Sequence, residues 1–231
     1  MTRRALLALS LLVCSQALAQ EPLPPGLHGV EKLAALVRRV SQVQASLATL
    51  SADFEQTRTS HLLAAPSVSR GRFYFRAPDS VRWEYDAPRE MTVLITGGVA
   101  ITYRPAEKRA ERIEIGRAQR RVFRFISAAE PLDKLMQHFT FVFHDPLGEG
   151  NYLLELKPAA LMMKKRLRSV TIEIDRTTYL PIKVSYTEAD GDSTAYSFSN
   201  VRLNQPQPPD LFTLSIPPDV QVVQIKLGSG E

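Results

Sequence analysis

The stretch GRFYFRAPDSVRWEYDAP, residues 71–88, decides the fold because apolar rings alternate with polar side chains along it. Val81 and Trp83 fall on one side of an extended chain, and Arg82 and Glu84 fall on the other. Successive side chains of a β-strand point to opposite faces, and prolines interrupt a strand. We therefore expect two short strands here, with one apolar face and one solvated face.

The spacing of apolar residues changes within the segment that precedes this stretch. Residues 31–50 carry apolar side chains at spacings of three and four, which predicts an amphipathic helix with one apolar stripe. From Ser51 onward the period is two, which predicts a strand around Phe54. The predicted stripe of the helix consists of Leu33, Leu36, Val37, Val40, Val43, Leu47 and Leu50.

The segments after this stretch continue as strands. Gly97 and Gly98 join two apolar runs, and two glycines accept the positive φ angles of a hairpin turn. Residues 117–136 favour two short helices, after which strands resume, with the last expected at residues 212–216. A large sheet with few helices must curl to cover its apolar face. The predicted fold is mainly β with α: an incomplete antiparallel β-barrel, or half-barrel, with helices over its open side and an interior that is either filled or hollow.

The amino terminus reads as an export signal. Arg3 and Arg4 precede an apolar run, and Ala17-Leu18-Ala19 fits a signal-peptidase site. We expect residues 1–19 to be a cleaved signal peptide, residues 20–30 an extended proline-rich leader, and residues 31–231 a single domain. The alternative is lipidation of Cys14, the only cysteine, although Val13 before it does not suit a lipoprotein site.

The formal net charge is +5 over the whole chain and the charges are scattered, which is typical of a solvated surface. One basic cluster is denser, at Met162-Met163-Lys164-Lys165-Arg166-Leu167-Arg168. It is suited to contact with anionic lipid or an acidic partner. A loop between strands is the more ordinary interpretation.

No catalytic pattern stands out. The four histidines His28, His61, His138 and His144 lack metal-ligand spacing, and no nucleophile elbow, phosphate loop or dinucleotide motif is present. Glu84 and Asp86 are close enough in sequence for acid/base chemistry, but alternation on a solvated strand face explains them. We expect no enzyme, no cofactor, no metal and no nucleic-acid partner. A binding protein is the better hypothesis.

Several motifs, in order and spacing, resemble the periplasmic LolA-type outer-membrane lipoprotein carrier family over about residues 31–223. The motifs are Phe54-Glu55-Gln56, the Gly71 strand with Pro78, Arg82-Trp83-Glu84-Tyr85 with Pro88, the hairpin ending in Tyr103-Arg104-Pro105, Tyr196-Ser197-Phe198-Ser199-Asn200 and Phe212-Thr213-Leu214-Ser215-Ile216-Pro217-Pro218. The resemblance implies an incomplete barrel with an α-helical lid over an apolar cavity that holds lipoprotein acyl chains.

The resemblance also implies partners. Loading would come from an inner-membrane lipoprotein-releasing ABC transporter, and release would go to an outer-membrane lipoprotein acceptor or directly to the membrane. We expect a soluble periplasmic monomer. Within this frame, the apolar strand positions become candidates for contact with lipid and the middle helices become candidates for the lid. The cavity candidates are Phe54, Phe73, Phe75, Val81, Trp83, Tyr85, Leu94, Ile101 and Tyr103. The lid candidates are Val122, Phe123, Phe125 and Ile126.

One position departs from the family pattern, in which an arginine directly before the proline ties lid to barrel. Here Ala77 precedes Pro78 and Arg76 lies one position earlier. A shift of one residue turns a strand side chain to the other face unless a bulge compensates. Arg76 is therefore a candidate latch whose face is in question.

Three other functions stay open at this stage. A carrier of another lipid, such as a glycolipid or polyketide, would have the same apolar wall. A membrane-anchored acceptor or stress sensor would need Cys14 to be lipidated or a second domain. An enzyme on the same fold is the most distant alternative.

Overall fold

The computed structural model describes residues 21–114, 138–146 and 150–225, and the predicted lid positions Val122, Phe123, Phe125 and Ile126 lie outside them. Helix α1 spans Gly29–Ala45 and buries its apolar stripe. It ends earlier than the pattern predicted. The Asn204 side-chain oxygen accepts hydrogen bonds from the backbone N–H groups of Ala48 and Thr49, which starts the first strand there.

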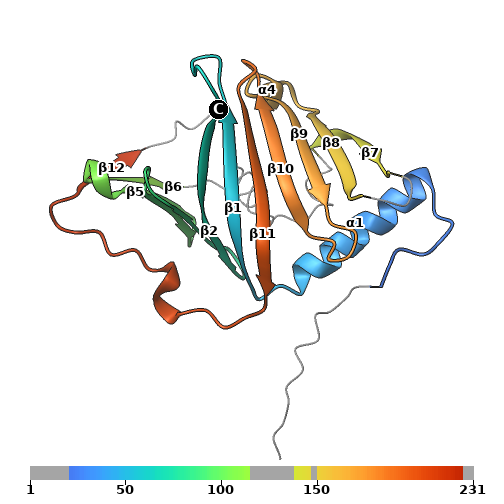
Figure 1. The fold of residues 1–231 in the computed structure, drawn as a ribbon, viewed down its shortest axis with the longest axis horizontal. Coiled ribbons are helices and arrows are strands. Elements are labelled where there is room, and N and C mark those ends of the chain that lie inside the picture. Colours follow the sequence, from blue (N-terminus) through green and yellow to red (C-terminus); the bar gives the residue numbers. More distant parts are fainter. Residues whose placement is uncertain (1–20, 115–137, 147–149, 226–231) are drawn as a thin grey trace, which may run out of the picture.

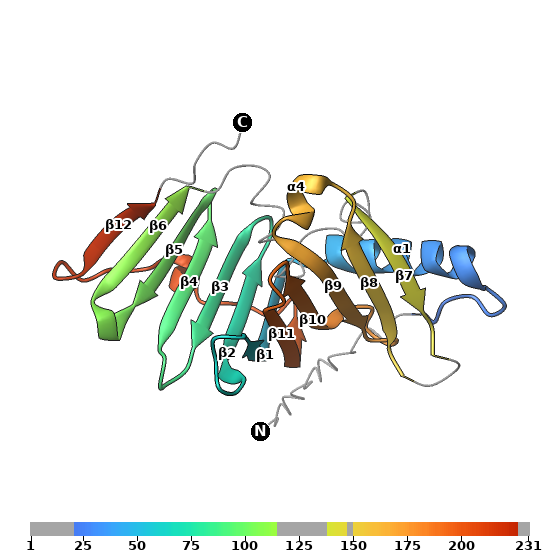
Figure 2. The ribbon, with the colours of Figure 1, turned by 90° about the horizontal axis from the view of Figure 1, so that it is seen from above.

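The described strands form one curved sheet that does not close (Figures 1 and 2). Its order is β12-β6-β5-β4-β3-β2-β1-β11-β10-β9-β8-β7. This confirms a mainly β, incomplete barrel. The strands are β1 Thr49–Thr59, β2 Ser67–Arg76, β3 Ser80–Tyr85, β4 Met91–Thr96, β5 Val99–Arg104, β6 Arg109–Glu114, β7 Phe139–His144, β8 Tyr152–Pro158, β9 Leu167–Ile174, β10 Pro181–Glu188, β11 Ser193–Leu203 and β12 Gln221–Ile225.

The carboxyl end of the sheet differs from the expectation. Residues 212–216 do not form a strand: Phe212 is the last residue of the short 3-10 helix η2, Pro209–Phe212, and residues 213–216 follow it without regular structure. The last strand is β12, which pairs with β6 in parallel, whereas every other pair in the sheet is antiparallel. A parallel pair needs a long crossover. Residues 204–220 provide it, and they cross the sheet between β11 and β6.

Register defines two faces of the sheet, because directly opposed residues of neighbouring strands share a face. We call the face that carries Phe54, Phe73 and Trp83 the inner face, and the face that carries Tyr74 and Arg82 the outer face. Gly97 and Gly98 form the expected hairpin turn between β4 and β5, with φ angles of 56° and 80°.

Helix α1 covers the inner face at the β8–β11 half of the sheet. Its buried residues belong to the same apolar core as Val184, Ile172 and Leu154, which are in register with Tyr196 of β11. In Figures 1 and 2 the helix lies beside β7–β10, well away from β4–β6. The β2–β6 half of the inner face therefore packs without this helix.

The outer face of β2 and β3 is covered by the carboxyl-terminal crossover, of which we call residues 205–216 the strap. Arg82 donates hydrogen bonds to the backbone oxygens of Leu211 and Thr213 at 3.0 and 3.3 Å. Gln207 Nε2 donates to the backbone oxygens of Leu50 and Phe75 at 3.2 and 3.3 Å. The strap thus fastens to backbone and side chains of the sheet together.

Candidate functional site: an aromatic inner face

Six aromatic rings gather on the inner face where β3, β2, β1 and β11 lie side by side. Trp83 is at the centre, with ring centroids of Phe73 at 4.7 Å, Phe54 at 4.8 Å and Tyr196 at 5.1 Å. The rings meet edge-on or tilted, which is the favourable geometry for aromatic pairs. We call this the aromatic cluster: Phe54, Phe73, Trp83, Tyr85, Tyr196 and Phe198.

A glycine makes room for this cluster. Gly71 lies opposite Phe54 on β1 and Tyr85 on β3. A Cβ at Gly71 would lie 1.8 Å from the backbone oxygen of Glu84 and 2.9 Å from the Phe54 ring. Position 71, in the middle of β2, is therefore occupied by glycine because three strands approach closely at that point.

The aromatic cluster contains one polar element. The hydroxyl groups of Tyr85 and Tyr196 hydrogen-bond to each other. Burial raises the pKa of Tyr85 to about 12, and the bond to Tyr196 only partly offsets that rise. Burial likewise raises the pKa of Tyr196. Both groups are neutral at physiological pH, so this part of the inner face carries no charge.

The apolar surface continues past the cluster in both strand directions. Val81 and Phe75 are opposed and buried beside Ile95 of β4. Met91 and Val93, opposite Tyr85 and Trp83, are only partly buried. Exposure of the side chains thus increases across the inner face. Trp83 at the aromatic centre is 6% exposed, and the aliphatic side chains at the margin on β4 are partly exposed.

Register places the predicted cavity residues in two groups. Phe54, Phe73, Phe75, Val81, Trp83 and Tyr85 come together on the inner face. Leu94, Ile101 and Tyr103 do not: Leu94 is opposite Arg82 and Ile101, and Tyr103 is opposite Thr92. These three lie on the outer face, so their placement on the same wall as Trp83 was wrong.

These three residues were misplaced because β4 carries apolar side chains on both of its faces. Val93 and Ile95 face inward, while Leu94 is buried on the face that the strap covers. Alternation therefore could not assign a face. Tyr196, Phe198, Met91, Val93 and Ile95 are the inner-face residues that sequence reasoning missed, and the alternating Tyr196-Ser197-Phe198 run was the available signal for the first two.

Arg76, the predicted lid latch, also lies on the outer face. It is opposite Thr49 and Ser80, and it donates a hydrogen bond of 2.8 Å to the backbone oxygen of Pro208. Its guanidinium lies 4.5 Å from the centroid of the Phe212 ring. No bulge interrupts the β2–β3 register, so the shift of one position is real, and Arg76 fastens the strap.

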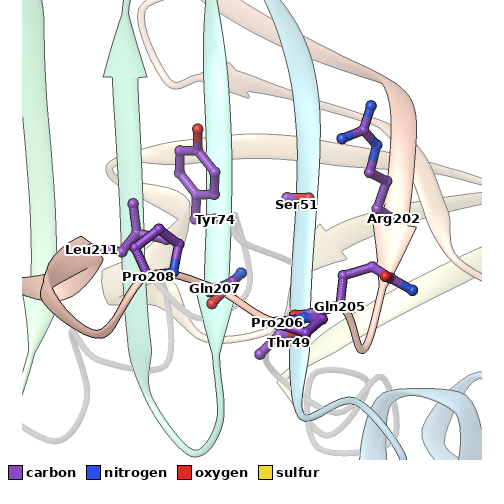
Figure 3. A pocket seen from close by; sticks show the side chains of 9 residues that line it. All are labelled: Thr49, Ser51, Tyr74, Arg202, Gln205, Pro206, Gln207, Pro208 and Leu211. Atoms are coloured by element: carbon purple, nitrogen blue, oxygen red, sulfur yellow. The ribbon is translucent and has the colours of Figure 1, made fainter.

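The outer face has its own cavity, shown in Figure 3, of about 620 Å³. Tyr74 and the strap residues Gln207 and Leu211 border it, and the buried Gln207 Oε1 has no hydrogen-bond partner among the described residues. The cavity lies on the face opposite the aromatic cluster, beside the hydrogen bonds from Gln207 to Leu50 and Phe75. The complete lining is Thr49, Ser51, Tyr74, Arg202, Gln205, Pro206, Gln207, Pro208 and Leu211.

The carboxylates considered for acid/base chemistry have structural partners. Glu84 bridges Arg82 at 2.8 Å and Arg72 at 3.3 Å, while Asp86 lies in the exposed turn after β3. Within residues 21–114, 138–146 and 150–225, no group of three or more His, Cys, Asp and Glu side chains is arranged to hold a metal ion. The described geometry offers an apolar binding face.

The structure is an open, half-barrel sheet with an apolar, aromatic inner face. The family model described as the outer membrane lipoprotein carrier protein LolA matches residues 45–215, so the chain belongs to the LolA family. The resemblance seen in the sequence is thereby confirmed. Family members of this name are carriers, and the conclusion for this chain at this level is a lipid or lipoprotein carrier.

Individual relatives are distant. An outer-membrane lipoprotein carrier protein of Haemophilus ducreyi is 27% identical over 197 residues, covering 84% of this chain and 85% of that protein. The protein of the same name from Pseudomonas aeruginosa is 21% identical over 200 residues, covering 84% and 87%.

One solved structure shows the same fold with a TM-score above 0.5. A conserved protein from Thermus thermophilus aligns with a TM-score of 0.53 at 11% identity, over 84% of this chain and 99% of that one. A LolA superfamily protein from Nitrosomonas europaea gives 0.43 at 11% identity, over 78% and 97%. In the described part of this chain, no helix combines the length and apolarity needed to cross a bilayer.

Proposed function

We propose that this chain is a periplasmic carrier that shields lipoprotein acyl chains on its inner face and moves them from the inner to the outer membrane. The observation that carries the proposal is the aromatic cluster with its aliphatic margin on β4. Membership of the LolA family supports it.

The chemistry of the face suits acyl chains. Each buried methylene is worth about 0.8 kcal/mol, so a lipid anchor cannot leave a membrane without an apolar shelter of comparable extent. The inner face provides aromatic and aliphatic surface in one continuous patch, with the Tyr85–Tyr196 hydroxyl pair satisfied internally. A neutral, internally satisfied wall makes no polar demand on its ligand.

Loading would require rearrangement at the centre of the face. Trp83 is 6% exposed, so an acyl chain can reach it only by displacing side chains that now cover it. Met91 and Val93 are partly exposed already and form the natural point of entry. In such a carrier, protein side chains and cargo compete for the same apolar surface. The cargo is released when the side chains return to that surface.

The route follows from the same proposal. Residues 1–19 would direct export and be removed, residues 31–231 would act as one domain, and the carrier would receive cargo from an ABC transporter of the inner membrane. Delivery would go to an outer-membrane acceptor or to the membrane itself. The chemistry at this site is binding and release, with no covalent step.

A matched pair of substitutions tests the proposal. Val93 and Val99 belong to the same hairpin and are both partly buried, but Val93 faces inward and Val99 outward. Val93→Gln should weaken binding of a synthetic triacylated lipopeptide about tenfold, because it places an amide in the apolar path. Val99→Gln should leave the affinity unchanged. Equal affinities for the two variants and the parent protein would exclude the inner face as the site.

A further inference from the structure

We propose that one end of the sheet docks on the surface of a bilayer that contains anionic phospholipid. This docking rim consists of the β1–β2 loop (residues 60–66), the segment 159–166 that includes the short helix α4 (Leu161–Lys164), and the β10–β11 turn (residues 189–192). It is separate from the inner face and does not depend on which lipid that face carries.

Aliphatic side chains protrude from the rim on two different loops. Leu62 is 82% exposed and Leu63 is 43% exposed in the β1–β2 loop, while Leu161 and Met162 of α4 are 72% and 69% exposed. Single exposed apolar residues are common on protein surfaces. Here four large ones lie at the same end of the sheet, and Leu62, Leu161 and Met162 are each mostly exposed, so they form a group and are not isolated exceptions.

Hydrogen bonds join the three segments into one surface. The backbone N–H and Nδ1 of His61 lie 3.2 and 2.8 Å from Asp192 Oδ1. The backbone N–H of Ala189 donates to the Arg166 oxygen at 3.1 Å, and Arg168 donates to the Ala189 oxygen at 3.2 Å. The β10–β11 turn thus holds the β1–β2 loop on one side and the α4 segment on the other, as the upper end of the sheet in Figure 1 shows.

Basic side chains flank the protruding residues. Lys164, Lys165, Arg166 and Arg168 come shortly after Met162 in the sequence, and segment 159–168 contains no acidic residue. Within the part of the chain that the structure describes, Lys164, Lys165 and Arg166 form no side-chain ion pair. Their charge is available to an external anion.

Acidic groups on the same rim come from β10 and its turn. Asp192 is buried and its carboxylate lies 2.8 Å from His61 Nδ1, so it is not exposed on the surface of the rim. Glu188 and Asp190 remain and reduce the attraction without reversing it, because four basic residues lie beside them. The rim is therefore a positive surface with apolar tips.

This combination fits a bilayer better than an acidic protein. Protein interfaces are centred on aromatic and arginine side chains that fill pockets in a packed surface. Here the apolar groups are aliphatic and stand out from loops, as is suited to insertion between headgroups, while lysine and arginine lie behind them at the level of phosphate. The geometry points to shallow insertion of Leu62 and Leu161 and electrostatic contact by the basic segment.

Vesicle flotation of the mature full-length protein tests the proposal. We expect the protein to float with phosphatidylcholine vesicles that contain phosphatidylglycerol and to remain behind with pure phosphatidylcholine vesicles. The double variant Lys164→Gln/Lys165→Gln should bind the anionic vesicles roughly tenfold or more weakly. Leu62→Ser/Leu161→Ser should lose a similar factor, because two insertion points are removed.

Two matched controls use exposed residues elsewhere on the sheet. Arg112→Gln/Arg202→Gln removes two cations from β6 and β11, and Val222→Ser removes an exposed apolar side chain from β12. Both should float like the parent protein. Absence of flotation with anionic vesicles, equal flotation with neutral vesicles, or equal losses in rim and control variants would each overturn the proposal.

Lipopeptide affinity separates this inference from the carrier function. The rim variants should keep the affinity of the parent protein for a triacylated lipopeptide in solution. A rim variant that loses lipopeptide affinity and vesicle binding together would assign the rim to cargo binding and contradict membrane docking.

Discussion

The two faces of β2 and β3 are both covered, but different kinds of interaction hold the two covers in place. On the inner face Phe73 and Trp83 contact other rings and aliphatic side chains, so the stabilisation is apolar and has little directional demand. On the outer face Arg76 and Arg82 donate hydrogen bonds to backbone oxygens of the strap. Such bonds fix one geometry. In the proposed function the apolar cover is exchanged for acyl chains, whereas the strap stays fastened to the outer face.

The largest expected effect is on the inner face, at its centre. Trp83→Ala should lower the free energy of unfolding by about 3–5 kcal/mol, because the cavity left among Phe54, Phe73 and Tyr196 can collapse only partly. Chemical denaturation monitored by circular dichroism measures this change. A loss under about 1 kcal/mol would mean that the cluster is loosely packed and would weaken the contrast between the faces.

The next effect concerns the close approach of strands beneath the aromatic cluster. Gly71→Ala should cost about 3 kcal/mol, the upper end of the range for overpacking, because the new Cβ meets the Glu84 backbone oxygen, which cannot rotate away. Gly97→Ala is the control: its Cβ would meet no atom within 4 Å, and only the positive φ of 56° opposes it. Equal losses of unfolding free energy at both positions would show that the close approach of the strands at Gly71 does not cause the destabilisation.

On the outer face we expect a smaller loss. Arg82→Met keeps the aliphatic stem but removes the hydrogen bonds to the Leu211 and Thr213 backbone oxygens, together with the ion pair to Glu84. The expected cost is about 1.5–3 kcal/mol, the range for charged hydrogen bonds. Arg76→Met should cost less, because Arg76 has one such bond and is on an exposed contact. Amide hydrogen exchange should speed up in the strap for both variants while β2 stays protected. Unchanged exchange in the strap would contradict its fastening by arginine.

The smallest effect is a pH dependence away from both faces. Burial alone would raise the pKa of Asp145, but hydrogen bonds from Lys32 of α1 and from Arg176 outweigh burial, and the net pKa is lowered. A lowered pKa contributes stability above the ordinary range of the carboxyl group and loses it as pH falls through the folded-state value. The parent protein should therefore lose stability below about pH 4.

Asp145→Asn should remove that part of the acid dependence, with a cost at neutral pH of less than about 1 kcal/mol. Asp219→Asn, which alters only the exposed pair with Lys108, is the control and should leave the acid limb as it is in the parent protein. Thermal unfolding across the acid range measures both. If stability falls equally with pH for Asp145→Asn and the parent protein, the ion pair between Asp145 and Lys32 of α1 does not contribute to the acid dependence.

Much of the fold could be predicted because residues 71–88 have a strict period of two and α1 a period near 3.6. These periods correctly assigned the faces of Phe73, Val81 and Trp83. The period failed at β4, where Leu94 and Val93 are both apolar. Which face is covered by the strap depends on contacts between residues more than 120 positions apart, such as Arg82 with Leu211, and alternation carries no trace of them.

The candidate site was predicted in part for the same reason. Rings on β2 and β3 were found, but Tyr196 and Phe198 join them only through the pairing of β1 with β11. The shift of one residue relative to Pro78 left the face of Arg76 open, and the β2–β3 register, which has no bulge, places Arg76 on the outer face. Local periods therefore predict which side a residue faces, and long-range pairing decides which residues meet there.

Fluorescence of Trp83 tests the central claim most directly, because Trp83 is the single tryptophan of the chain. A triacylated lipopeptide that carries bromine on its acyl chains should quench this fluorescence saturably, and an unbrominated copy should reverse the quenching by competition. This result would show acyl chains against the aromatic cluster. Saturable binding of the lipopeptide with no quenching of Trp83 would contradict the claim and assign the cargo to another surface.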